Sequence, residues 1–314
     1  MSTTFQLDTS TSRANPTPQP MKRLTVPKIR AHKADGETRE PLVMLTAYTA
    51  RQAQLLDAHC DILLVGDSLA QVIYGLPTTI PVTLDMMANH AAAVVRGSYH
   101  SVVVVDMPFG SYEQSPQQAF ESATFLPKQS GAAAVKLEGG AELAETIEFL
   151  TQRGVPVMGH IGLTPQHVNQ LGGYRVQGKT EDTANQVLED ALALQDAGAF
   201  AVVLELIPVE LAKRITEALV IPTIGIGAGV HCDGQVQVFH DMLGLDPDFR
   251  PRHSGKYTEL APIIKDALIR YSDDVRAGTF PTDAQSFFSD ETRVSTPTPA
   301  PPPETVNDPA AASD

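Results

Sequence analysis

Cysteine is scarce in this sequence, which has only Cys60 and Cys232 in 314 residues. Two cysteines are too few for a disulfide framework, and their wide separation does not suggest a zinc cluster. We therefore expect a reducing compartment, the cytoplasm.

Basic residues are few as well. Lys and Arg number 23 against 37 Asp and Glu, which gives a formal net charge of −14. Nucleic acids and anionic membranes bind clustered Lys and Arg, so we expect neither as a partner. The expected partner is a small molecule.

Long apolar runs are missing too. No segment approaches the roughly 18 apolar residues of a membrane span, and residues 1–23 lack the apolar core of a secretory signal. We expect 1–23 to be a disordered leader, and organelle targeting stays open because this segment is rich in Ser and Thr. Residues 289–314 are rich in Pro, Thr and Ala and are expected to form a disordered acidic tail, since they cannot bury enough apolar surface to offset the entropy of ordering. The folded domain is then 24–288.

The chain does contain a regular alternation of strand-like and helix-like patterns. Seven apolar runs have the length of buried strands: 41–48, 61–67, 101–108, 132–138, 155–162, 200–207 and 221–227. Helical patterns cover 50–59, 84–96, 116–128, 142–153, 183–197, 209–219, 233–240 and 259–276. Pro127 should end or kink the third helix. The alternation predicts a short eighth strand at 242–245.

Near-continuous apolar strands joined by helices indicate a parallel sheet covered on its faces. Eight such units match the size of an α/β (β/α)8 TIM barrel, and a doubly wound open sheet is the alternative. A barrel gathers all its strand ends around one mouth, whereas an open sheet forms a crevice between two or three strands. Since strands two to six all carry polar candidates at that end, we predict the barrel.

Two carboxylates close neighbouring strands, Asp67 the second and Asp106 the third. In a barrel they can converge on one hard cation, which prefers oxygen ligands. The alternative is that each Asp caps the helix that follows it. Two carboxylates at matching positions favour the cation.

Charged residues also interrupt the fourth and fifth strands. Lys136 and Glu138 are two residues apart, so in a strand both point the same way, into the barrel mouth. A structural ion pair is the alternative, but an anionic substrate and a cation would give both residues partners. His160 ends the fifth strand, where a hydrogen-bonded core histidine is the alternative to a role in the site.

Glu205 has the most apolar sequence surroundings of any acidic residue here, within VVLELIP. Burial there favours proton exchange near neutral pH, as acid–base catalysis requires, and pairing with Lys136 or a backbone donor is the alternative. The glycine-rich run 225–229 either cradles phosphate or only makes room. The long insertion 163–182 is typical of a lid or an oligomer contact.

Six collinear segments carry a resemblance to a known family. They are VGDSLAQVIYG, DMPFGSY, VKLEGG, GHIGLTPQHVNQLGGYRVQGK, LELIPVELAKRITEAL and IPTIGIGAGVHCDGQVQVFHDMLGL. In this order they resemble ketopantoate hydroxymethyltransferases, over about residues 24–288. Segments of this length are far more specific than any short motif above.

The resemblance implies a barrel of the phosphoenolpyruvate/pyruvate type, one Mg²⁺ per subunit, and 5,10-methylenetetrahydrofolate as one-carbon donor. It implies transfer of a hydroxymethyl group to 3-methyl-2-oxobutanoate, giving 2-dehydropantoate in pantothenate biosynthesis. It also implies a homo-oligomer, commonly a decamer. Carried over by position, Asp67, Asp106 and Glu138 are the metal ligands, Glu138 through water; Asp67, Ser68, Asp106, Lys136 and His160 bind substrate; and Glu205 is the catalytic base.

A few residues depart from the family pattern, namely Thr49, Ala70 and Pro127, and none touches the expected chemistry. Another Mg²⁺-dependent 2-oxo acid carbon–carbon lyase or mutase on the same barrel is the alternative function. The lyases of that group typically need a cysteine-containing loop, which is missing between the fourth and fifth strands. A scaffold without activity is the other alternative, but it predicts decay of the acidic residues, all of which are present.

Overall fold

The computed structural model describes residues 22–35, 40–248 and 251–289. The expected leader and tail therefore lie outside the described residues, apart from 22–23 and 289. The described residues form two compact units, which divide after Leu260.

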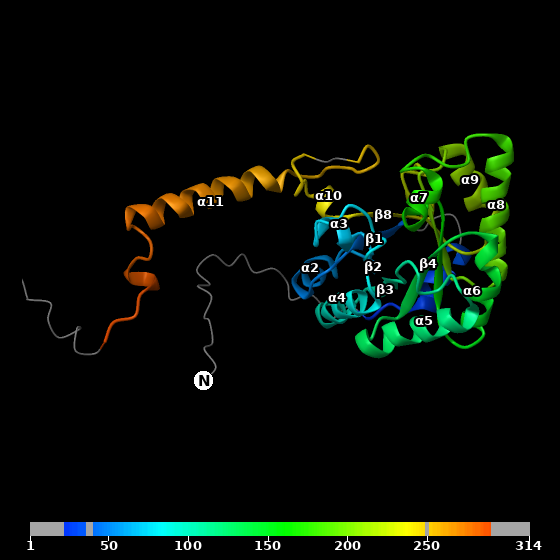
Figure 1. Cartoon of the computed structure of the whole chain (residues 1–314), viewed down its shortest axis with the longest axis horizontal. Helices are drawn as coiled ribbons and strands as arrows, with labels where there is room; N and C mark the ends of the chain where they lie inside the picture. Colours follow the sequence, from blue (N-terminus) through cyan, green and yellow to red (C-terminus); the bar gives the residue numbers. More distant parts are fainter. Residues whose placement is uncertain (1–21, 36–39, 249–250, 290–314) are drawn as a thin grey trace, which may run out of the picture. The chain divides into compact units, whose positions relative to one another are not determined.

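The first unit is a closed barrel of eight parallel strands in sequence order, in which β8 pairs with β1 (Figure 1). The strands are β1 (Leu42–Thr46), β2 (Ile62–Val65), β3 (Val102–Asp106), β4 (Ala134–Glu138), β5 (Val157–Gly162), β6 (Ala201–Glu205), β7 (Thr223–Ile226) and β8 (Gly234–Gln237). Closure confirms the predicted TIM barrel and excludes the open sheet.

Helices follow most of the strands and surround the barrel (Figure 1). The α-helices are α1 (Val26–Arg30), α2 (Ala50–Leu56), α3 (Leu69–Val72), α4 (Leu84–Gly97), α5 (Pro116–Ser130), α6 (Ala144–Thr151), α7 (Val168–Leu171), α8 (Glu181–Asp196), α9 (Val209–Ala218) and α10 (Phe239–Met242). Short 3-10 turns are η1 (Ala31–Asp35), η2 (Ala141–Leu143) and η3 (Pro165–His167). Four helices start at hydroxyl caps that accept a backbone N–H three residues on: Thr49, Thr83, Ser115 and Thr180.

Apolar side chains fill the inside of the barrel, among them Met44, Leu64, Val104 and Met158. Ile29 of α1 belongs to the same cluster, and the backbone just before α1 is tied to the start of β3 by the bond from the Leu24 N–H to the His100 carbonyl. Helix α1 therefore closes the amino-terminal end of the barrel. The opposite end, where the strands finish, is left for polar side chains.

The predicted eighth strand at 242–245 is wrong, as is the predicted helix at 233–240. Strand β8 is Gly234–Gln237, and Met242 ends the short helix α10. The sequence of β8 hides it, because its side chains alternate between buried and exposed and two of the four are glutamines. Gly234 also has no room for a side chain, since a Cβ there would lie 2.7 Å from the Leu42 carbonyl oxygen.

Pro127 was predicted to end or kink the third helix, and it does not end it. Helix α5 runs through Pro127 to Ser130 and stops at Gly131, whose φ of 78° is left-handed. Pro127 removes one hydrogen bond near the helix end, and the burial of Ala123 and Leu126 on the same helix outweighs that loss.

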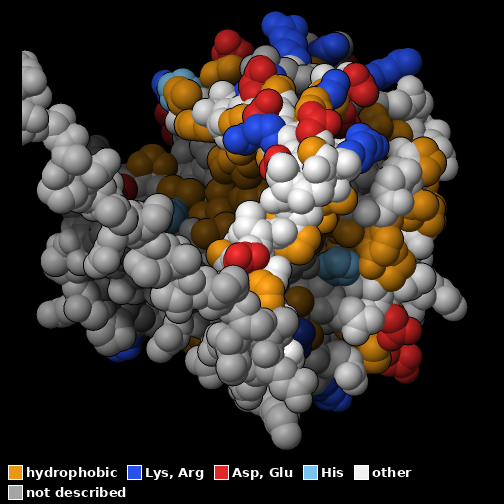
Figure 2. All heavy atoms as spheres, turned by 90° about the vertical axis from the view of Figure 1, so that its left-hand side faces the viewer, with side chains coloured by type: hydrophobic (Ala, Val, Ile, Leu, Met, Phe, Trp, Pro, Cys, Tyr) orange, Lys and Arg blue, Asp and Glu red, His pale blue; other side chains and the backbone are white. Residues whose placement is uncertain are grey.

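The second unit contains α11 (Leu260–Ala277) and η4 (Asp283–Gln285). Helix α11 confirms the helical pattern at 259–276, and Tyr271 packs edge-to-face on Phe280 at 5.5 Å. Within the described ranges, no helix is both long and apolar enough to span a membrane. Figure 2 shows Lys and Arg side chains interspersed with acidic and apolar ones on the face that it draws.

Candidate active site

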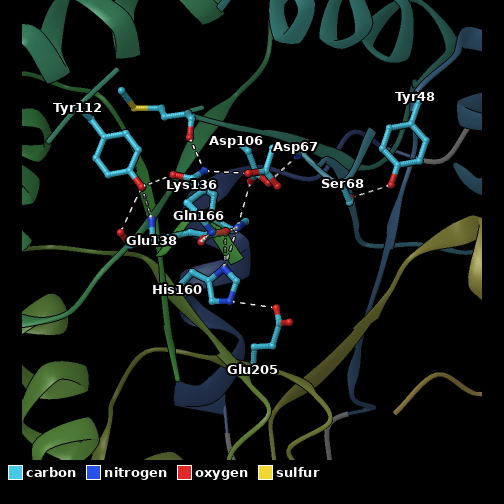
Figure 3. A network of polar contacts seen from close by, with 11 residues as sticks. Tyr48, Asp67, Ser68, Asp106, Tyr112, Lys136, Glu138, His160, Gln166 and Glu205 are labelled. Atoms are coloured by element: carbon cyan, nitrogen blue, oxygen red, sulfur yellow. Dashed lines mark hydrogen bonds and ion pairs between the residues drawn. The ribbon is translucent and has the colours of Figure 1, made fainter. Parts of the chain in front are cut away.

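Six ionisable side chains from five neighbouring strands meet at the carboxyl-terminal mouth of the barrel (Figure 3). The parallel register sets Asp106 opposite Lys136 and Glu138 opposite His160. Asp67 follows β2 and Glu205 ends β6. All except Glu205 are buried, with at most 4% of their surface exposed. The structure thus brings together the ionisable residues that the sequence singled out.

Lys136 occupies the centre of this cluster. Its Nζ lies 3.3 Å from Asp106 Oδ1, 3.7 Å from Glu138 Oε1 and 2.9 Å from His160 Nδ1. Burial acts to lower the pKa of Lys136, but Asp106 and Glu138 outweigh it and raise the pKa above its usual range. The ammonium is therefore held in its charged form, ready for an anionic ligand.

The buried carboxylates of Asp67, Asp106 and Glu138 lie close together with little positive charge beside them. Burial, Glu138 and Asp106 raise the pKa of Asp67 to about 8, and burial likewise raises that of Asp106. Burial opposes ionisation of Glu138 too, yet His160 and Lys136 bring its pKa down to about 2. Lys136 and His160 together do not balance Asp67, Asp106, Glu138 and Glu205, so a bound divalent cation would offset the remaining negative charge.

The donor set suits a hard divalent ion held by few protein ligands. Asp67 and Asp106 are adjacent, since the Asp67 N–H donates to Asp106 Oδ2 at 3.0 Å, and Asp106 Oδ1 is buried without a hydrogen bond. Over the described residues, no three acidic, His or Cys side chains are arranged to hold a metal by themselves. Mg²⁺ usually keeps several waters and binds one or two carboxylates, so the residues present fit it.

His160 links the acids at the mouth to Glu205. Its Nε2 lies 3.2 Å from Glu205 Oε2, and its Nδ1 lies 3.4 Å from Glu138 Oε1. Burial and Lys136 act to lower the pKa of His160, but Glu138 and Glu205 raise it to about 9. The contact between Nε2 and Glu205 is an ion pair, since Nε2 makes no aligned hydrogen bond. The partner of Glu205 is therefore His160, and not Lys136 as the sequence left open.

Ser68 reaches the same cavity from the turn after β2. Its Oγ is 2.9 Å from the hydroxyl of Tyr48, which is buried behind it, and its side chain does not cap α3 (Figure 3). Gly66 is required for this turn, because a Cβ there would lie 2.8 Å from Ser68 Oγ. The Ser68 hydroxyl can therefore hydrogen-bond with a ligand that is bound next to Asp67.

Gln166 is the site residue that the sequence did not reveal. Its side-chain amide donates to Asp67 Oδ2 and to the Met107 carbonyl, both at 2.9 Å, and its Oε1 accepts from the Tyr112 hydroxyl at 2.6 Å. Its backbone N–H donates to Glu138 Oε2 at 2.9 Å. A single Gln in the loop after β5 carries no pattern of its own, so only the fold identifies it.

The six ionisable residues and Ser68 line a cavity of about 730 Å³. The insertion after β5 forms part of its wall through Leu163, Pro165 and Tyr174, and Gln71 of α3 lines the same cavity. The insertion thus covers one side of the cavity, as a lid does. The glycine-rich run makes room, because a Cβ on Gly227 would lie 2.9 Å from His253 Cβ.

A family model described as ketopantoate hydroxymethyltransferase matches residues 23–283. The 3-methyl-2-oxobutanoate hydroxymethyltransferase of Erythrobacter litoralis is 69% identical over 287 residues, which cover 91% of this chain and 99% of that protein. The enzyme of the same name from Novosphingobium aromaticivorans is 66% identical with the same coverage.

Solved structures share the barrel at much lower identity. Phosphoenolpyruvate phosphomutase from Streptomyces platensis matches with a TM-score of 0.55 and 14% identity, over 86% of this chain and 94% of that one. A 2,3-dimethylmalate lyase, described as a member of the PEP mutase/isocitrate lyase superfamily, matches with a TM-score of 0.50 and 15% identity, over 83% and 91%. These likenesses establish the fold alone, a (β/α)8 barrel as predicted.

Proposed function

The chain belongs to the ketopantoate hydroxymethyltransferase family, and from this premise we propose that its reaction takes place in the acidic mouth of the barrel, with Mg²⁺ and 5,10-methylenetetrahydrofolate. The activity is that of the family, hydroxymethyl transfer to 3-methyl-2-oxobutanoate in pantothenate biosynthesis. The observation that supports this site is the convergence of Asp67, Asp106, Lys136 and Glu205 on one cavity.

Asp67 and Asp106 would hold the Mg²⁺ directly, and Glu138 would hold it through water. Their adjacency supports this assignment, as does Asp106 Oδ1, which accepts no hydrogen bond and has only the Lys136 ammonium beside it. The bound ion supplies Lewis acidity, which draws charge onto the keto oxygen of the substrate and so acidifies its C3 hydrogen.

Lys136 and Ser68 bind the keto acid. The Lys136 ammonium is kept charged by its acidic neighbours and pairs with the substrate's carboxylate or carbonyl oxygen. Asp67 and Ser68, adjacent in sequence, contact the substrate from the β2 side, and His160 contacts it from β5. This arrangement fixes the reacting carbon relative to the base.

Glu205 is the base that removes the C3 hydrogen. Its side chain is 14% exposed and lines the cavity, whereas Glu138 is enclosed by Lys136 and His160. The His160 ring, 3.2 Å away, holds the Glu205 carboxylate in one orientation. The carbanion equivalent at C3 forms the new carbon–carbon bond to the donor's methylene carbon. Both carbon–nitrogen bonds of that carbon break, water supplies the hydroxyl oxygen, and 2-dehydropantoate and tetrahydrofolate leave.

Hydrogen–deuterium exchange at C3 of the keto acid tests the base without the folate donor. Glu205→Gln should lose the exchange, while Glu210→Gln, a control in the first turn of α9, should retain it. Undiminished exchange in Glu205→Gln would rule out Glu205.

We further propose that the catalytic domain is 24–288, and that the protein is a cytoplasmic homo-oligomer of the decameric kind. Apolar side chains on α11 support subunit contacts, since Ile263 and Leu268 are 59% and 60% exposed. A gel-filtration mass equal to one chain would contradict the oligomer.

A further inference from the structure

The cavity extends well beyond the acidic cluster, toward the ends of β7 and β8. A volume of about 730 Å³ is typical of a drug-sized ligand, and a five-carbon keto acid needs only a small part of it. Tyr174 and Gln71 cover the β2 and β5 side. The remaining space is walled by Ile226, Val238 and Leu245.

Helix α10 contributes His240 and Asp241 to that side, and the other polar side chains that line it are Gln237, Asp246, Arg252 and His253. The Phe239 N–H donates to Thr46 Oγ1 at 2.9 Å, which fixes the start of this helix against β1. His240 Nδ1 is buried without a hydrogen-bond partner. Asp241 is partly buried and receives no hydrogen bond from the described residues. Burial lowers the pKa of His240 and raises that of Asp241, so both groups lack the solvation that a bound ligand could replace.

This side of the cavity is close to the acidic cluster. The His240 ring is 5.5 Å from the ring of Tyr48, whose hydroxyl is 2.9 Å from Ser68 Oγ. A ligand that contacts His240 is therefore separated by the ring of Tyr48 from a keto acid bound at Ser68.

We propose that the β8–α10 side of the cavity, with Asp241 and His240 as its polar groups, binds the reduced pterin ring of the folate donor; this rests on the proposed function. The pyrimidine edge of that ring carries a 2-amino group and an N3–H, two parallel donors that match the two oxygens of a carboxylate. Asp241 accepts both, and His240 hydrogen-bonds with the neighbouring O4. The apolar walls cover the faces of the ring.

Arg252 is placed to bind the other end of the folate donor, its glutamyl tail. It lines the cavity and is exposed, and its loop is held against β8 because Gln237 Oε1 accepts from the Ser254 hydroxyl at 3.1 Å and from the Gly255 N–H at 2.7 Å. A guanidinium at the rim suits the carboxylates of the glutamyl tail. The donor then lies with its pterin inside and its tail at the opening.

Calorimetric titration of the full Mg²⁺-loaded chain with tetrahydrofolate, which has no carbon to transfer, tests the subsite directly. Asp241→Asn should weaken binding by about 10- to 100-fold, the factor that the loss of charge-assisted hydrogen bonds commonly carries. The KM for the donor should rise by a similar factor, while the KM for the keto acid stays within twofold and shows that the barrel is intact. Asp248→Asn, the same change on an exposed residue that does not line the cavity, should bind as tightly as the unsubstituted chain.

A second titration separates the two ends of the donor. Arg252→Gln should weaken the binding of tetrahydrofolate several-fold and leave the binding of 6-methyltetrahydropterin, which has no tail, unchanged. Asp241→Asn should weaken the binding of both compounds. Binding of tetrahydrofolate to Asp241→Asn within twofold of the unsubstituted chain would overturn the subsite and leave the proposed function intact. If the unsubstituted chain exchanges the C3 hydrogen but neither binds tetrahydrofolate nor transfers a carbon from 5,10-methylenetetrahydrofolate, the assignment of the folate donor is wrong and so is the subsite.

Discussion

Replacing Gln166 by Leu tests whether this residue holds the metal-binding carboxylates in place. The substitution keeps the size of the side chain and removes its three hydrogen bonds, to Asp67, to the Met107 carbonyl and from Tyr112. About 1 kcal/mol for each neutral bond and about 2 kcal/mol for the bond to a carboxylate put the loss of unfolding free energy at about 4 kcal/mol. That is a large part of an ordinary domain's stability.

The same change should weaken the binding of Mg²⁺ more than it weakens the binding of the keto acid. Partners that orient metal ligands typically account for about 10- to 100-fold in metal affinity, and Gln166 is bonded to Asp67 directly and to Glu138 through its backbone. The assay is a Mg²⁺ titration of C3 hydrogen exchange at saturating keto acid, alongside urea unfolding.

The matched control is Gln152→Leu, which removes one exposed contact, from Gln152 to Glu148 at 2.9 Å. It should change the unfolding free energy by less than about 0.5 kcal/mol and leave the Mg²⁺ dependence unaltered. If Gln166→Leu keeps its Mg²⁺ affinity within twofold, Gln166 does not orient the site and the reasoning is refuted.

Three further changes have defined outcomes. Asp57 accepts from Ser98 Oγ and from three backbone N–H groups, and although burial opposes ionisation these bonds lower its pKa to about 2. Because the pKa of Asp57 is depressed in the folded state, its contribution to the unfolding free energy is present above about pH 3.9 and is lost as the pH falls through about 2. Asp57→Asn should therefore lower the unfolding free energy, measured with urea, by about 2 kcal/mol at pH 7 and by much less near pH 2. A Cβ on Gly97 would lie 2.2 Å from the Ala50 carbonyl oxygen, so Gly97→Ala should lower the unfolding free energy by about 1–3 kcal/mol, and an unchanged urea midpoint would contradict this. Excess chelator should abolish C3 exchange and added Mg²⁺ should restore it; activity that survives chelation would remove the metal from the mechanism.

The strands of the barrel were predictable where they are apolar throughout. Val102–Asp106, for example, is a run of four valines that ends in an acid, and both its burial and the emergence of Asp106 at the rim follow from this. The same logic brings Lys136 and His160 into one cluster, since parallel strands in register end together. Their roles in binding and catalysis stay predictions.

The rest depends on packing that no local pattern encodes. Strand β8 has two glutamines and a glycine among its four residues, so its membership of the sheet follows from closure of the ring and not from its own sequence. Pro127 sits in a helix because buried neighbours outweigh one missing hydrogen bond. Gln166 becomes a site residue only when the loop after β5 folds back over Asp67.

The central claim is that acids from separate strands hold one divalent ion against the keto acid, and anomalous diffraction from crystals grown with Mn²⁺ and 3-methyl-2-oxobutanoate tests it most directly. We predict a single anomalous peak per chain within about 2.0–2.3 Å of carboxylate oxygens of Asp67 and Asp106, with the keto acid beside Lys136. A peak elsewhere, or a keto acid bound away from these carboxylates, would contradict the account.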